Sequence, residues 1–283
     1  MKIILSPAKK MNVDTDTFNY LDLPQYLDQT QEILSWLKQK SYEELKSLWR
    51  CNDKIAEQNA ERLLHMDLHK ALTPAILSYE GIAYQYMAPS VFETSQFSYL
   101  QEHLRILSAF YGVLKPMDGV TPYRLEMQAK AAINGHKDLY ALWGSRLYEA
   151  VRDTDGFIVN LASKEYARCI ENHLSGDDTY ITCIFGDRID GKVVQKGTYA
   201  KMARGEMVRY MAENQILNPQ EMKSFDRLQY HFCEGLSSEH EYVFMRDEEK
   251  NQNGGSYDEK QNNAVNDNDC GYDAVRMREQ AIV

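Results

Sequence analysis

The chain has 283 residues, of which 43% are hydrophobic and 11% aromatic, so it is long enough to bury a substantial core in one large domain or in two. Its formal net charge of −10 argues, at first sight, against a nucleic-acid partner. No apolar run approaches the ~18 residues of a membrane span, and the N-terminus lacks the pattern of a secretion signal, so we expect a cytoplasmic protein.

The negative charge is unevenly distributed along the chain. Residues 247–283 contain nine acids and four bases, so this segment has a net charge of −5, and residues 1–246 have the other −5. A mildly acidic domain can still hold a basic cleft, because binding responds to the local potential. The segment 247–283 is also rich in Asn, Asp and Gly and poor in aliphatic residues, which predicts a disordered acidic tail after one domain at 1–246.

The first element expected in chain order is a short buried strand at 2–6, with the sequence KIILS. Lys9 and Lys10 follow it directly. Two lysines just past a strand end are a plausible anion site, although adjacent lysines more often keep a loop soluble.

A helical region is expected at 28–64, with a pause near Cys51 where Asn52 or Asp53 can cap the next helix. Arg50 and Lys54 flank the turn of this short-linked helical pair, which occupies about 41–64. The first amides of the second helix, together with those cations, would suit a phosphate. The alternative is an ordinary helical hairpin.

The segment 74–114 combines runs typical of strands, AILSY and RILSAFYGVL, with a helical stretch near 97–103. The loop 116–127 lies between turn-forming residues and is a candidate site loop. In an extended segment its Arg124 and Glu126 would face the same side and could pair with each other, which would be a structural role.

One amphipathic helix is expected at 137–153, a buried strand at 157–161, and a further helix capped by Ser163 that bears Lys164. Helix, strand and helix in this order indicate a parallel strand with a crossover connection. In open α/β sheets ligands bind beyond the carboxyl ends of the strands, which here means residues 160–164.

Two strands around the hairpin signal at 190–191 lead into a helix at 197–214. One side of this helix is apolar, and the other groups Lys201, Arg204 and Arg209 around Gly205. A helical glycine costs about 1 kcal/mol relative to alanine, so it needs a reason, such as the close approach of a phosphate or of a neighbouring element. A short helix from Pro219 and two closing strands follow.

Signatures of nucleotide-binding loops, zinc proteases and serine hydrolases are missing from the sequence. The histidines lack a supporting ligand motif and the cysteines a catalytic one, so we expect no metal and no cofactor. Cations beside small or aromatic residues, without an obvious nucleophile, favour phosphate binding over turnover. The alternative from another class is an enzyme acting on a phosphorylated nucleotide or damaged base, with Lys9 or Lys164 as an activated group and Glu126 or Glu165 as acid and base.

Five segments, MKIILSPAKKMN, LRILSAFYGVLKPMDGVTPYRLEM, LYALWG, VNLASKEY and GTYAKMARGEMVRYMAEN, closely resemble the YaaA family of bacterial peroxide-stress proteins in order and spacing. The resemblance covers about residues 1–246. It implies a cytoplasmic DNA-binding protein that limits oxidative DNA damage and free intracellular iron. No established catalytic activity comes with the family.

The implied fold is a mixed α/β domain with a central mixed sheet, a positively charged cleft and a helix-hairpin-helix element, which would be the helical pair at 41–64. Its turn departs from the usual pattern, because Cys51-Asn52 stands where a glycine is typical. Together, the residues and the resemblance place these in the DNA or phosphate site: Lys9, Lys10, Arg50, Lys54, Arg124, Lys164, Lys201, Arg204, Gly205 and Arg209.

Overall fold

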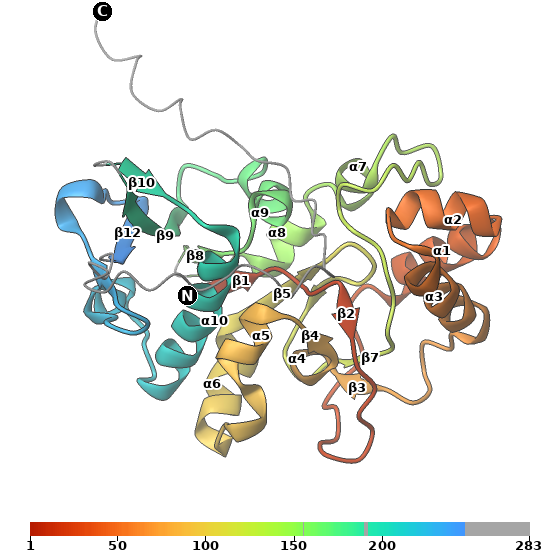
Figure 1. The fold of residues 1–283 in the computed structure, drawn as a ribbon, viewed down its shortest axis with the longest axis horizontal. Helices are drawn as coiled ribbons and strands as arrows, with labels where there is room; N and C mark the ends of the chain where they lie inside the picture. The colour runs from red at the N-terminus through yellow and green to blue at the C-terminus, as the bar shows by residue number, and fades with distance from the viewer. Residues whose placement is uncertain (155, 190–191, 247–283) are drawn as a thin grey trace, which may run out of the picture.

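A large mixed sheet forms the centre of the protein (Figure 1). The structure is a computed structural model that describes residues 1–154, 156–189 and 192–246. Its strand order is β11–β12–β9–β8–β1–β5–β6, and β10 pairs with β9 outside that path. Five of its strands are parallel neighbours: β5 (Leu104–Ser108), β1 (Lys2–Leu5), β8 (Phe157–Leu161), β9 (Thr179–Ile189) and β12 (Glu241–Arg246). The expected mixed α/β fold with a central mixed sheet is confirmed.

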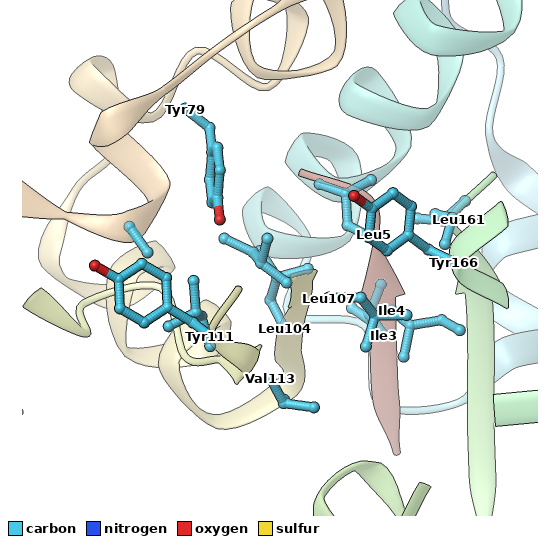
Figure 2. Packing of buried hydrophobic residues seen from close by; sticks show 14 of the residues in the cluster. Ile3, Ile4, Leu5, Tyr79, Leu104, Leu107, Tyr111, Val113, Leu161 and Tyr166 are labelled. Atoms are coloured by element: carbon cyan, nitrogen blue, oxygen red, sulfur yellow. The ribbon is translucent and has the colours of Figure 1, made fainter. Parts of the chain in front are cut away.

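Inside the sheet, between β5 and β8, lies β1, which was expected as a buried strand. Ile3 pairs with Leu104 on one side and with Val159 on the other, and Ile3 and Ile4 are fully buried. A strand that is covered on both faces reads as a continuous apolar run, which explains the KIIL sequence. Figure 2 shows its three apolar side chains among those of the neighbouring elements.

Helices cover both faces of the sheet (Figure 1). One face has α5 (Ile82–Met87), α6 (Thr94–His103) and α10 (Gly197–Glu213), and the other has α8 (Arg146–Val151) and α9 (Lys164–Glu171). The expected helices near 97–103 and at 197–214 are therefore present.

The helical region near the N-terminus consists of α1 (Leu27–Lys38), α2 (Tyr42–Trp49) and α3 (Asp53–His65), which lie beside one another at one end of the molecule (Figure 1). Ser41 and Glu44 form a capping box at the start of α2. Asn52, one of the two expected caps, accepts a hydrogen bond from the amide of Ile55 and begins α3. The short-linked helical pair is thus confirmed as a pair of helices.

The run AILSY was wrongly expected to be a strand. It forms the short α4 (Ala75–Ser78) and only then enters β4 (Tyr79–Glu80), which pairs with β2 (Lys10–Met11). Such a short apolar run does not distinguish a buried helical turn from a strand. The neighbouring short elements are β3 (Thr73–Pro74), which pairs with β7 (Gly119–Val120), the 3-10 helix at Pro89–Val91, and β6 (Gly112–Leu114), antiparallel to β5.

The single helix expected at 137–153 is instead two short ones, α7 (Leu139–Trp143) and α8. Gly144 separates them with φ 53° and ψ −134°, a backbone conformation that does not continue the helix and that glycine adopts without strain. The amphipathic pattern extends across the break because both helices pack on the same core.

The remaining predictions for the C-terminal half agree with the structure where it is described. β10 (Lys192–Val194) pairs antiparallel with β9, although the hairpin signal at 190–191 lies outside the described residues. A 3-10 helix at Pro219–Ser224, β11 (Tyr230–Phe232) and a short 3-10 turn at Glu234–Leu236 precede β12. The tail predicted at 247–283 also lies outside the described residues. None of the described helices is long and apolar enough to span a membrane.

Candidate phosphate-binding surface

The loop after β1 and the start of α9 face each other at the carboxyl ends of two central strands. The amide of Ser163 donates a hydrogen bond to Ser6 Oγ (2.8 Å), and Ser6 Oγ donates to Ser163 Oγ (3.1 Å). The hydroxyl of Tyr84, in α5, donates to the carbonyl of Ser6 (3.0 Å). These contacts hold the two segments together at the carboxyl ends of the strands, which is where ligands of α/β proteins bind.

Lys9 and Glu126 make the second contact of this region. Lys9 Nζ lies 3.2 Å from Glu126 Oε1, and Arg124 Nη2 lies 3.9 Å from the same oxygen. The expected Arg124–Glu126 pairing is therefore present, with both side chains on one side of the loop while Tyr123, Leu125 and Met127 are buried. Glu126 thus joins cations from two separate segments.

Glu165, in the first turn of α9, lies beside this pair. Its Oε1 accepts a hydrogen bond from the amide of Gln128 (3.1 Å). Burial, and secondarily the nearby Glu126, raise the pKa of Glu165, while that hydrogen bond and Lys9 act against the rise. The region therefore holds two carboxyl groups and two cations close together.

Arg124 also connects this region to the helical pair. Its Nη2 donates to the carbonyl of Trp49, the last residue of α2, over 3.5 Å. The Nε of Arg124 and the Nε1 of Trp49 are buried and have no hydrogen-bond partner among the described residues. A small cavity between the turn and the loop is lined by Leu48, Trp49, Arg50, Glu126, Gln128 and Ala129.

The turn of the helical pair exposes both of its predicted cations. Arg50, the C-cap of α2, has φ 45° and ψ 54°, the left-handed conformation usually taken by glycine, and Lys54 lies in the first turn of α3. Lys164 is exposed at the start of α9. Lys10 is exposed as well, but its Nζ pairs with Glu80 (2.7 Å).

The predicted cations of α10 lie in different surroundings. Lys201 is exposed, whereas Arg204 is half-buried and its Nε has no partner among the described residues. Burial lowers the pKa of Arg204. Arg209 Nε is bonded to Glu213 (2.8 Å), which also pairs with Arg227. Arg209 is therefore part of an ion-pair network.

Gly205 is packed against α5 and does not face an open space. A Cβ built at Gly205 would overlap the carbonyl oxygen of Ala83 and lie 2.7 Å from the carbonyl carbon. The expectation that this glycine lets a phosphate approach is wrong, and the alternative, a neighbouring element, is correct. Val208, three residues further along α10, is also buried.

The structure places Lys9 and Arg124 beside Glu126, and Lys164 precedes Glu165 in the first turn of α9. Arg50 and Lys54 lie on the helical pair that Arg124 contacts. The sequence did not single out Ser6 or Gln128. Both make their contacts across long sequence separations: Ser6 meets Ser163 because β1 pairs with β8, and Gln128 meets Glu165 because the loop 121–128 lies against the start of α9. The part of the chain that the structure describes contains no group of three His, Cys, Asp or Glu side chains suited to a metal ion.

Comparison with known proteins gives one consistent result. Residues 1–236 match the sequence model of the family described as peroxide stress protein YaaA. A UPF0246 protein of Agathobacter rectalis is 65% identical over 246 residues, which are 87% of this chain and 99% of the relative. UPF0246 proteins of Lachnoclostridium phytofermentans and Pediococcus pentosaceus are 56% and 55% identical, each over 88% of this chain and over 97% and 99% of their own lengths.

Proposed function

Because this chain belongs to the family of peroxide stress protein YaaA, we propose that it binds duplex DNA without reading its sequence and thereby limits oxidative DNA damage under peroxide stress. A lower level of free intracellular iron is part of the same proposal. The proposed surface consists of the loop after β1, the loop 121–128, the start of α9 and the turn between α2 and α3.

The observation that carries this proposal is the position of Arg124. Its guanidinium reaches the carbonyl of Trp49 in the helical pair and also lies beside Glu126, which pairs with Lys9. Cations from three segments that are distant in the sequence are linked through Arg124 and Glu126, which supports a shared phosphate-binding surface. A cationic surface that presents no side chains to the base edges in a DNA groove binds the phosphate backbone. The backbone is the same in every sequence.

The helical pair would act as a helix-hairpin-helix element. Arg50 and Lys54 project from its turn and from the first turn of α3, where unbonded amides favour an anion. Asn52 already accepts the amide of Ile55, so the cations contribute more of the phosphate contact than in a glycine turn. Lys201 and Arg204 on α10 would extend the surface in a positively charged cleft.

The test is the salt dependence of binding to two short duplexes of unrelated sequence, followed by fluorescence anisotropy. We expect equal affinities that fall steeply between about 50 and 200 mM salt. The double variants Arg50→Gln/Lys54→Gln and Lys9→Gln/Lys164→Gln should weaken binding to both duplexes alike. Each should also make the slope of log affinity against log salt shallower by about 1.8, which corresponds to two lost phosphate contacts.

The matched control is Lys70→Gln/Lys192→Gln. It removes the same charge from exposed positions in the loop after α3 and in β10, which are not among the segments of the proposed surface. The control should keep the salt slope of the unsubstituted protein. Salt-insensitive binding, or equal losses in all three double variants, would refute the proposed surface.

A further inference from the structure

We propose that the carboxyl ends of β1 and β8 form a binding site for a phosphorylated ribose, as in a nucleoside monophosphate. The site consists of Ser6, Lys9, Glu126, Ser163 and Glu165. It concerns a ligand different from the duplex backbone, and it stands or fails separately from duplex binding.

The position of the site in the sheet is the first reason. From β1 the chain passes through α6 to β5 on one side, and from β8 it passes through α9 to β9 on the other. The helices α6 and α9 lie on opposite faces (Figure 1). The strand ends between them are the topological switch point, where open α/β sheets bind small ligands. Ser6 directly follows β1 at this point, and Ser163 lies two residues after the end of β8.

The second reason is that two segments meet there, both with each other and with the loop 121–128. Ser6 and Ser163 are bonded at 2.8 and 3.1 Å, and further along these two segments Lys9 reaches Glu126 of the loop 121–128, while Glu165 accepts a hydrogen bond from Gln128 of that same loop. Because the Ser6 hydroxyl donates to Ser163 Oγ, the hydrogen of the Ser163 hydroxyl is left for another acceptor. Lys9 and Ser163 are thus suited to phosphate oxygens.

The third reason is the mixed charge of the site. Glu126 and Glu165 lie beside the lysine, and carboxylates repel a bare anion. They accept hydrogen bonds from hydroxyl groups, as carboxylates do for ribose in dinucleotide-binding sheets. A ligand that bonds both to Lys9 and Ser163 and to the two carboxylates must have a phosphate group and neighbouring hydroxyl donors. Phosphorylated ribose has this combination, whereas inorganic phosphate and the duplex backbone of DNA lack the free sugar hydroxyls.

Isothermal titration calorimetry on the full chain tests the inference with AMP, ribose 5-phosphate, inorganic phosphate and adenosine. We expect AMP and ribose 5-phosphate to bind at least about tenfold more tightly than inorganic phosphate or adenosine. Inorganic phosphate lacks the sugar hydroxyls that contact the carboxylates, and adenosine lacks the phosphate group that contacts Lys9 and Ser163. Glu126→Gln and Lys9→Gln should each weaken AMP binding about tenfold or more. Glu80→Gln removes the carboxylate of the neighbouring Lys10 pair and should leave AMP binding unchanged.

A single-stranded RNA with and without a terminal 5′-phosphate separates strand ends from free nucleotides as the source of the phosphorylated ribose. Tighter binding of the phosphorylated RNA than of AMP and of the unphosphorylated RNA would assign the site to strand ends. Tighter binding of AMP would assign it to free nucleotides. Thermal unfolding confirms that each variant is folded. Equal affinity for AMP and inorganic phosphate, or undiminished AMP binding by a folded Glu126→Gln variant, overturns the inference even if duplex binding is intact.

Discussion

Gly205 of α10 lies directly against Ala83 of α5. A Cβ at Gly205 would be 2.7 Å from the Ala83 carbonyl carbon and 2.9 Å from its Cα, and both are backbone atoms that no rotamer change can move. The glycine therefore sets the distance between two helices on the same face of the sheet. Its conformational cost within α10 is offset by this close packing.

Substitution at Gly205 is accordingly expected to act on stability. Gly205→Ala forces α5 and α10 apart and should lower the free energy of unfolding by about 2 kcal/mol, measured by urea denaturation. Gly197→Ala is the matched control, because a Cβ there meets no described atom within 4 Å, and its effect should stay within about 0.5 kcal/mol. Equal effects of the two substitutions would contradict the packing role.

Arg50 allows charge and backbone strain to be separated. Its left-handed backbone, with φ 45°, costs a side-chain-bearing residue about 1 kcal/mol. Arg50→Gly and Arg50→Ala remove the same charge and should weaken DNA binding equally. Only Arg50→Gly relieves the strain. Its free energy of unfolding should therefore be about 1 kcal/mol higher than that of Arg50→Ala. Matching stabilities of the two variants would show that the turn is not strained.

Glu126 competes with DNA for the cations of the proposed surface. Its carboxylate lies 3.2 Å from Lys9 and 3.9 Å from Arg124, so Glu126→Gln removes a competing negative charge from beside both cations. We expect duplex affinity to rise about threefold or more, which is the scale of an exposed ion pair. Asp67→Asn frees Lys70 from a 3.2 Å pair and is the control for net charge. A gain no larger than in the control would remove Lys9 and Arg124 from the DNA surface.

This prediction also separates the two proposed ligands. Glu126→Gln is expected to strengthen duplex binding and to weaken AMP binding, because the carboxylate repels a backbone phosphate and accepts a bond from a ribose hydroxyl. Changes in the same direction would mean that both ligands contact the site in the same way, and the phosphorylated-ribose inference would fail.

Asp153 predicts a specific loss of stability in acid. The hydrogen bond from Lys2, at 2.8 Å, lowers the pKa of Asp153 to about 2 in the folded chain, below the ~3.9 of an unfolded one. A lowered carboxyl pKa contributes stability above the unfolded value, and this is lost as pH falls from about 4 toward 2. Asp153→Asn should cost about 1 kcal/mol at neutral pH, after allowance for partial exposure, as measured by urea denaturation. The difference from the unsubstituted chain should shrink over that acid range, and a constant difference would contradict it.

Local chemistry was enough to predict most of the elements. The apolar run of β1, the cap at Asn52 and the amphipathic pattern of α10 each depend on neighbours within a few residues, and each element occurs where it was expected. The same holds for the pairing of Arg124 with Glu126, because alternate residues of an extended segment share a side. AILSY failed because the helical and strand patterns coincide over so few residues.

Only the tertiary structure decided what those elements face. The sequence placed a glycine among cations on α10, but the partner of Gly205 is Ala83, 122 positions earlier, and an amphipathic pattern does not identify which element packs on a face. Ser6 and Ser163 meet because β1 pairs with β8, and Arg124 reaches Trp49 because the helical pair packs on the loop 121–128. The sequence by itself determined the elements and the cations available, since these depend on short-range periodicity and side-chain chemistry. The packing of distant segments decided which cations share a surface, because that depends on strand order and on the distance between helices.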